Sequence, residues 1–226
     1  MPSVESSPSV NCLSATLSKE AERAELLRRY LNVYWLRPEN AFWTVLRSLA
    51  WRCVPVTSPS LDLSCGDGVF SFIHAGGEFG PSFDVFQAVG RLDRVTRDHA
   101  DMFDQVPADG YAPEVACRPA WNIDVGTDLK PSLLSKADAL SFYGALVQHD
   151  NNDALPFCDG EFRTVYCNSA KWVRNIEGFL SQIARVTRPD GTVTLHVKLD
   201  TIQQYTLAPF RAQLGERVLE IIDRGR

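Results

Sequence analysis

The sequence lacks the features that mark membrane, secreted and nucleic-acid-binding proteins. It has no run of about 20 apolar residues, the length that a helix needs to cross a bilayer. Its first residues have neither the basic start nor the apolar core of a secretory signal. No lysine- or arginine-rich block is present and the formal net charge is −5, so a nucleic-acid partner is not expected. We therefore expect a cytoplasmic protein without a membrane contact.

Cysteine is too sparse and too scattered to organise the fold. The 6 cysteines include no C-x-x-C pair, so neither a disulfide framework nor a metal site is expected. Scattered free thiols are typical of a reducing compartment. With 45% hydrophobic and 23% charged residues, the composition is that of a globular protein, and 226 residues suffice for one α/β domain with a buried core.

The N-terminal part divides into a tail and a pair of helices. Residues 1–17 are rich in Ser and Pro, which predicts a disordered tail. Over residues 18–56 apolar residues recur at helical spacing and Pro38 starts a second helix, which predicts an N-terminal helical cap. Two roles stay open for its aromatic residues, Tyr34 among them: they pack on a sheet, or they cover a ligand pocket.

The remaining residues, 57–226, alternate between strand and helix patterns. This alternation predicts a doubly wound, Rossmann-like parallel sheet, with ligands bound at the carboxyl ends of its strands. Residues 76–120 fit no simple strand–helix unit and are interpreted as an insertion, in which acids and a histidine at 98–104 fit a solvated helix face better than a metal site. The further predicted elements are strands at 122–128, 145–148, 163–167 and 192–199, helices at 131–139, 175–186 and 202–226, and a turn at 188–191.

The stretch Leu61 to Phe70 predicts a strand, a small-residue turn and the start of a helix. Asp62, Ser64, Gly66 and Gly68 occupy alternate positions in it. Glycines let the backbone pass close to a ligand, and the amides of such a turn face the ligand. The same letters also suit a β-turn that binds nothing. The pattern differs from the G-x-G-x-x-G of dinucleotide-binding proteins, which disfavours an NAD-linked oxidoreductase.

An acid at the end of the next strand can accept hydrogen bonds from both hydroxyls of a ribose. The usual separation of about 20 residues from the glycine motif would nominate Asp84. We prefer Asp128, because a strand precedes it and a helix started by Pro131 follows it.

Taken together, these blocks resemble the class I S-adenosylmethionine-dependent methyltransferases, of the type 11-like group. The turn is similar to the family's Asp/Glu-x-Gly-x-Gly-x-Gly motif, with Ser64 in place of its first glycine. Asp-Val-Gly-Thr-Asp-Leu, ending at Leu129, resembles the second strand with its ribose-binding acid, and Arg-Val-Thr-Arg-Pro-Asp-Gly, ending at Gly191, resembles the turn before strand five. The resemblance implies S-adenosylmethionine as the cofactor.

The resemblance also places further residues around the cofactor. Asp150, with Asn151 beside it, is the candidate acceptor for the adenine amine, although a capping turn would use the same residues. Asn168 follows strand four, where the family lines the methyl-transfer site. The expected cofactor-binding residues are Asp62, Ser64, Gly66, Gly68, Asp128, Leu129, Asp150, Asn151 and Asn168, and the expected substrate-pocket residues are Tyr34 and Trp172.

No general base can be assigned from the motifs. Arg163 follows Phe162 where the family often has Asp, and Lys171-Trp172 stands where many relatives carry Glu-His. His149 is a weak candidate. Because the methyl group of a sulfonium is already activated, positioning a nucleophile supplies much of the rate and a base is not essential.

The sequence thus predicts methyl transfer to a small-molecule acceptor at O, N or C. The alternative is a non-catalytic methyltransferase-like partner or regulatory subunit. The family's sheet ends with a hairpin of two strands after strand five, and the sequence has no residues for it. We therefore expect either a truncated form or a sheet completed by a partner subunit or a second copy, since open strand edges invite pairing.

Overall fold

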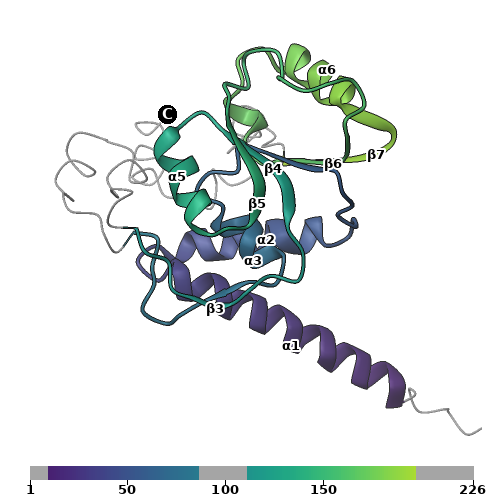
Figure 1. Ribbon diagram of the computed structural model, residues 1–226. Coiled ribbons are helices and arrows are strands. Elements are labelled where there is room, and N and C mark those ends of the chain that lie inside the picture. The colour runs from purple at the N-terminus through teal and green to yellow at the C-terminus, as the bar shows by residue number, and fades with distance from the viewer. Residues whose placement is uncertain (1–9, 87–110, 197–226) are drawn as a thin grey trace, which may run out of the picture. The chain divides into compact units, whose positions relative to one another are not determined.

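The computed structural model describes residues 10–86 and 111–196, which are the coloured parts of Figure 1. Their centre is a five-stranded sheet in the order β5-β4-β1-β6-β7, with every neighbouring pair parallel. The strands are β1 (Ser60–Leu63), β4 (Ile123–Asp128), β5 (Tyr143–Gln148), β6 (Phe162–Cys167) and β7 (Thr187–Leu195). The predicted doubly wound sheet is confirmed: the chain runs outward from β1 to one edge and returns to the other side through β6.

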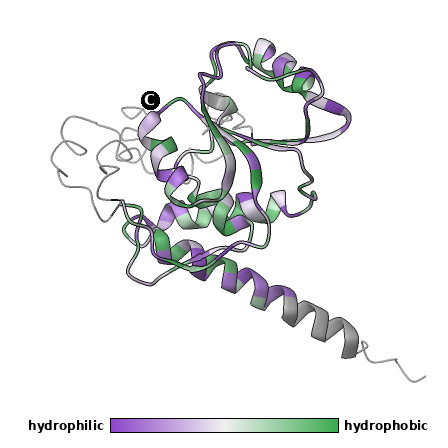
Figure 2. Cartoon of the chain, in the orientation of Figure 1, coloured by the Kyte–Doolittle hydropathy of each residue, from purple (hydrophilic) through white to green (hydrophobic). Residues whose placement is uncertain are grey.

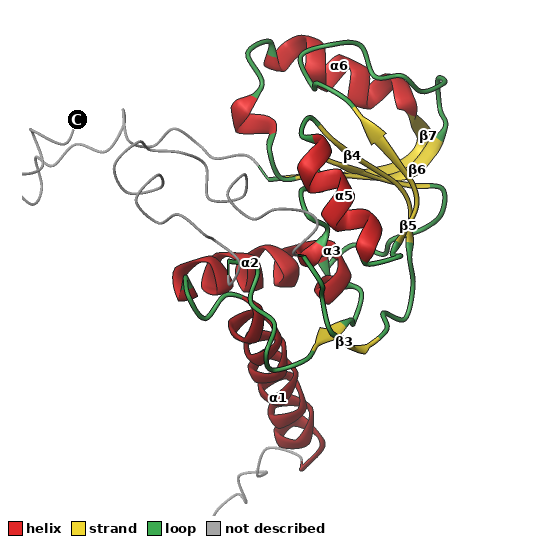
Figure 3. Cartoon of the chain, turned by 60° about the vertical axis from the view of Figure 1, so that its left-hand side comes forward, coloured by secondary structure: helices red, strands yellow, loops and turns green. Residues whose placement is uncertain are grey.

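Helices and a small second sheet surround the strands (Figure 3). The helices are α1 (Val10–Val33), α2 (Pro38–Trp51), α3 (Val69–His74), α5 (Pro131–Ala139) and α6 (Ile176–Val186), with a 3₁₀ turn η3 at Ala170–Trp172. Proline stands at the start of both α2 and α5, where its missing N–H costs nothing. The short strands β2 (Glu78–Phe79) and β3 (Val115–Cys117) pair antiparallel.

The first helix is longer than the sequence pattern predicted. It begins at Val10, so the expected tail over residues 1–17 is wrong from that position onward. The physical reason lies in the distribution of proline: Pro2 and Pro8 both precede Val10, and no proline or glycine follows until Pro38. Residues 1–9 lie outside the described part of the chain.

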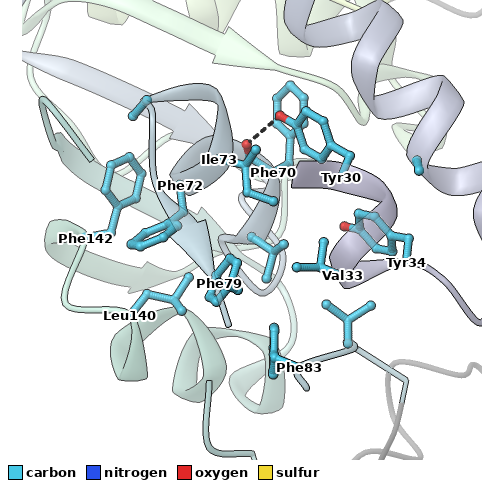
Figure 4. Close-up of a cluster of buried hydrophobic side chains, with 14 of the residues drawn as sticks. Tyr30, Val33, Tyr34, Phe70, Phe72, Ile73, Phe79, Phe83, Leu140 and Phe142 are labelled. Carbon is cyan, nitrogen blue, oxygen red and sulfur yellow. Dashed lines mark hydrogen bonds between the residues drawn. The ribbon is translucent and has the colours of Figure 1, made fainter. Parts of the chain in front are cut away.

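One face of the sheet is covered by a large aromatic cluster shared by α1, α2 and α3. Tyr30 is fully buried, and its hydroxyl donates a hydrogen bond to the carbonyl of Phe70 at 3.0 Å (Figure 4). Trp51 stacks on Tyr166 with ring centroids 3.8 Å apart and on His74 at 4.2 Å. Burial of each such side chain contributes about 1.5–3 kcal/mol, so this cluster holds the helical cap on the sheet.

The opposite face of the sheet packs against α6. Leu61 and Leu63 of β1 point to this side, together with Val165 of β6. From α6, Phe179 and Ile183 meet them, and hydrophobic and hydrophilic residues alternate around this helix (Figure 2). Because side chains alternate along a strand, Asp62 between the two leucines faces the other side.

Helix α2 buries mainly small and polar side chains and leaves two of its large apolar side chains exposed. Its buried residues include Ala41, Thr44, Val45 and Ser48, whereas Phe42 is 54% exposed and Leu46 58% exposed. Small side chains let the helix approach its neighbours closely, and Ser48 Oγ lies 2.9 Å from Nδ1 of His74. The buried face of α2 therefore combines small apolar side chains with a polar contact to α3.

The first described part of the expected insertion, residues 76–86, contributes to the core. Phe79 and Phe83 are both 2% exposed in the cluster that holds α1 and α3. The carboxylate of Asp84 accepts hydrogen bonds from the amides of Leu36 and Phe86, at 3.1 and 2.7 Å. The acids and histidine at 98–104 and the helix expected at 202–226 lie outside the described residues.

The turn expected at 188–191 is absorbed into β7. Phe162 pairs with Thr187 and Thr164 pairs with Thr192, so the register shifts between these two pairs. The Pro and Gly in this segment form a bulge within the strand instead of ending it.

Candidate functional site

A cavity of about 560 Å³ lies at the carboxyl ends of β1, β4, β5 and β6, where α2 forms a further wall. Ten of the residues predicted from sequence line it. They are Tyr34, Ser64, Gly66, Asp128, Leu129, His149, Asp150, Asn151, Asn168 and Trp172. Asp62 and Gly68 are not among its lining residues. Both of these residues instead contact neighbouring helices and strands, as described below.

Asp128, the last residue of β4, is tied to the glycine turn. Its Oδ2 accepts the amide of Gly66 at 3.0 Å, and its Oδ1 accepts the amide of Lys130 at 2.9 Å. The side chain is 9% exposed, and burial raises the pKa of Asp128 although both amides favour its ionised form. A carboxylate has about four lone-pair sites, so acceptor capacity is left for a ligand.

Asp84, the alternative ribose acid, is not a lining residue of the cavity. Its two oxygens are engaged by the amides of Leu36 and Phe86, and it is 1% exposed. The strand-end context was therefore a better guide to the cavity than the usual motif spacing.

The turn after β1 uses left-handed backbone at three alternate positions. Ser64, Gly66 and Gly68 have φ of 60°, 62° and 77°. A Cβ at Gly66 would meet no atom within 4 Å, whereas one at Gly68 would lie 2.9 Å from Cε2 of Tyr143 and 3.2 Å from Cδ1 of Leu140. Gly66 thus keeps the cavity open, while Gly68 lets α3 pack closely on the segment around β5.

Asp62 lies beneath this turn. It is 1% exposed and accepts hydrogen bonds at Oδ2 from Oγ of Ser71, at 2.5 Å, and from the hydroxyl of Tyr143, at 2.9 Å. Burial raises the pKa of Asp62 to about 6, against the lowering effect of these two donors. Asp62 therefore connects β1 to α3 and β5 beneath the turn and does not line the cavity.

The loop after β5 contains a capping turn at Asp150 and the side-chain amide of Asn151, which faces the cavity. Oδ1 of Asp150 accepts from the backbone and side-chain nitrogens of Asn152, at 2.9 and 2.7 Å, so the capping-turn alternative is correct for this oxygen. These hydrogen bonds lower the pKa of Asp150. Asn151 donates from Nδ2 to Oγ of Ser64 at 2.9 Å, and its Oδ1 is buried with no hydrogen-bond partner in the part of the chain that the structure describes.

Two more buried nitrogens at the cavity have no hydrogen-bond partner among the described residues. They are Nε2 of His149 and Nε of Arg47. Burial lowers the pKa of His149 below its usual value, which keeps the imidazole neutral at pH 7. Because an unpaired buried polar group costs about 1–3 kcal/mol, these atoms together with Oδ1 of Asn151 indicate a wall built to receive a polar ligand.

The sequence reasoning missed the α2 wall and Asp67. Arg37, Asn40, Thr44 and Arg47 line the cavity from α2 and the residue before it. Their spacing of three or four residues is the signal that could have found them. Asp67, between the two glycines, is 8% exposed and also lines the cavity, and burial raises its pKa to about 6.

The rim of the cavity is apolar and exposed. Trp172 is 77% exposed and Leu129 54% exposed. Of the predicted substrate-pocket residues, Trp172 thus lies at the edge, while Tyr34 is 6% exposed. Cys65 also lines the cavity, but burial raises the pKa of its thiol, so it stays protonated.

Within 10–86 and 111–196, no three His, Cys, Asp or Glu side chains are grouped to hold a metal ion. In the same ranges, no helix is long and apolar enough to cross a membrane. The cysteines at positions 53, 65, 117, 158 and 167 are free thiols.

Residues 109–195 match the family model of the methyltransferase domain. This segment includes β3 through β7 and leaves the glycine-rich turn and the helical cap outside it. The match confirms the resemblance to the class I S-adenosylmethionine-dependent methyltransferases. No curated protein matches the sequence.

Solved structures with a similar course of the chain include several methyltransferases. One is the complex between the Haloferax volcanii Trm112 methyltransferase activator and a methyltransferase, with 18% identity over 79% of this chain and 56% of that chain and a TM-score of 0.40. A SAM-dependent methyltransferase of Thermotoga maritima has 13% identity, the same coverages and a TM-score of 0.41. Haemonchus contortus phosphoethanolamine N-methyltransferase 1, bound to phosphoethanolamine and S-adenosylhomocysteine, has 15% identity over 66% of this chain and 24% of that chain, with a TM-score of 0.40. The chain thus spans little more than half the length of the first two structures.

Proposed function

We propose that the protein binds S-adenosylmethionine in this cavity and transfers its methyl group to a small-molecule acceptor. The observation that carries the proposal is that Asp128 and Asn151, which lie at or just after the ends of neighbouring strands, line the same cavity. Asp128 has lone pairs left at the end of β4, and Oδ1 of Asn151 is buried without a partner. A nucleoside offers donors for both, because its ribose has two hydroxyls and its adenine has an exocyclic amine.

The lining residues fit the parts of the cofactor. Asp128 would accept the ribose hydroxyls, Asn151 would accept the adenine amine, and the open position at Gly66 would let the backbone approach the ligand closely. Leu129, half exposed beside Asp128, would offer apolar surface to the base. Asp150 keeps its capping role and lines the same wall.

When bound, the cofactor supplies a methyl group activated on a sulfonium. The chain's part is then to hold the two reactants in line and to exclude water, which can supply much of the rate without acid–base help. Asn168 after β6 and Tyr34 before α2 line the cavity from two different sides and are positioned to orient the acceptor. Where the acceptor must lose a proton, His149 is the candidate base, because its buried Nε2 is unpartnered and its lowered pKa keeps it neutral.

The acceptor is proposed to be a small molecule because of the size and walls of the cavity. A volume of about 560 Å³ lies within the range of roughly 300–1,000 Å³ typical of small-ligand sites. The net charge of −5 disfavours a nucleic acid as substrate.

The experiment is calorimetric titration with S-adenosylhomocysteine of the wild type, Asp128→Ala and Asp153→Ala. Asp153 is an exposed carboxylate close to the cavity that does not line it, so it controls for charge alone. Loss of charged hydrogen bonds at Asp128 should weaken binding by about 1–3 kcal/mol, that is roughly 5- to 150-fold. Equal binding by all three proteins would refute the role of Asp128. Weaker binding by an Asp84→Ala variant instead would identify Asp84 as the ribose-binding acid.

The non-catalytic alternative predicts the same binding and no transfer. It is favoured by the exposed Trp172 at the cavity rim, where many relatives carry Glu-His. The two proposals separate when the protein is incubated with methyl-labelled S-adenosylmethionine and a metabolite extract. Labelled product that is absent with Asp128→Ala supports the enzyme, and bound cofactor without any labelled product supports the partner subunit.

A further inference from the structure

The α2 wall of the cavity carries a cation, Arg47, that forms no ion pair with any of the described residues. Arg47 lines the cavity, and the central carbon of its guanidinium lies 5.8 Å from the ring centroid of Phe70, another lining residue. Among the residues that the structure describes, no carboxylate lies within ion-pair distance of Arg47, and its Nε–H is buried without an acceptor. The other arginine of this wall, Arg37, is paired with Glu39 at 2.7 Å.

The buried Nε–H of this half-exposed side chain would gain from a ligand that supplies an acceptor. An unsatisfied buried donor on a charged group costs more than one on a neutral group. The cation–π contact with Phe70 offers no acceptor for Nε–H. Arginine presents a planar fork of donors that matches the oxygens of a carboxylate or phosphate.

The charges of the cavity are unevenly distributed. The strand-end wall carries the buried carboxylates Asp67 and Asp128 beside Lys130, whereas the helix wall carries Arg47 and has no carboxylate among its described lining residues. An anionic group would be attracted to the helix wall. A ligand with a nucleoside at one end and an anion at the other would match both.

We propose that Arg47 is the anion-binding residue of the cavity and receives the carboxylate or phosphate of a bound ligand. The inference rests on the proposed function in that it concerns the same cavity. Two sources supply this chemistry: the amino acid carboxylate of the cofactor, or an anionic group on the acceptor.

The test compares two probes that differ by the carboxylate. S-adenosylhomocysteine carries the amino acid group, and 5′-methylthioadenosine has the same nucleoside and thioether without it. Each is titrated calorimetrically into the wild type, Arg47→Met, Arg47→Lys and Arg23→Met. Arg23 is exposed on α1 and does not line the cavity, so it is the matched control. Thermal unfolding of each variant confirms that it is folded.

The expected result is that Arg47→Met weakens S-adenosylhomocysteine at least tenfold, leaves 5′-methylthioadenosine within twofold, and is partly rescued by Arg47→Lys. If both nucleosides bind unchanged, pyrophosphate is titrated into protein saturated with S-adenosylhomocysteine. Binding to the wild type and not to Arg47→Met then assigns Arg47 to the acceptor's anion. Equal weakening of both nucleosides, or no change with any probe, overturns the proposal. A wild type that binds neither nucleoside overturns the proposed function instead, and pyrophosphate titration of the free protein still decides the role of Arg47.

Discussion

Replacing each glycine of the turn by alanine should separate its two structural roles. Both Gly66 and Gly68 have left-handed backbone, which costs an alanine about 1–2 kcal/mol. At Gly68 the new methyl would also press on Tyr143 and Leu140, at 2.9 and 3.2 Å, and overpacking of this kind costs about 1–3 kcal/mol. We therefore expect Gly68→Ala to lose about 2–5 kcal/mol of unfolding free energy and Gly66→Ala about 1–2 kcal/mol.

Ligand affinity should change in the opposite order. The methyl at Gly66 would enter open space at the cavity wall and obstruct a bound nucleoside, so Gly66→Ala should bind S-adenosylhomocysteine on the order of tenfold more weakly. Folded Gly68→Ala should bind within about twofold of the wild type, since Gly68 does not line the cavity. Urea unfolding and calorimetry measure the two quantities. Equal stability losses, or an affinity loss confined to Gly68→Ala, would refute the assignment.

Two other aspartates give predictions that do not concern the ligand directly. Burial raises the pKa of Asp62 to about 6 from an unfolded value near 4, so the folded protein holds more protons between these values and its unfolding free energy falls as the pH rises through this range. Asp62→Asn removes this titration. Urea unfolding should therefore show that the unfolding free energy of the variant, relative to the wild type, rises by roughly 1 kcal/mol between about pH 5 and about pH 7.5. A difference in unfolding free energy that does not change with pH would contradict a raised pKa of Asp62. Asp84→Ala leaves the amides of Leu36 and Phe86 without their acceptor and should cost about 1–3 kcal/mol of stability with S-adenosylhomocysteine affinity within twofold, so a marked affinity loss would place Asp84 in the site.

The parts of the fold that the sequence predicted well have strong local determinants. The strand, small-residue turn and helix around Gly66 follow from residue types that few other conformations tolerate, and Pro131 fixes the start of α5. Asp128 reached the cavity because parallel strands bring their carboxyl ends to one edge of the sheet. Such positions depend on the order of elements, which the sequence pattern shows.

The parts that it missed depend on packing between distant segments. The inward face of α2 is decided by contacts of Ser48 with His74, which the helix's own apolar spacing does not reveal. Gly68 serves the packing of α3 against Tyr143, far away in sequence. Arg47 became a candidate only when the cavity showed that its Nε has no acceptor.

A crystal structure of the protein with S-adenosylhomocysteine would show directly whether this cavity holds the nucleoside with its ribose on Asp128. Both ribose hydroxyls should lie within about 3 Å of the Asp128 carboxylate, with the adenine amine at Oδ1 of Asn151. A nucleoside bound elsewhere on the protein, or bound in this cavity with its ribose away from Asp128, would contradict this prediction.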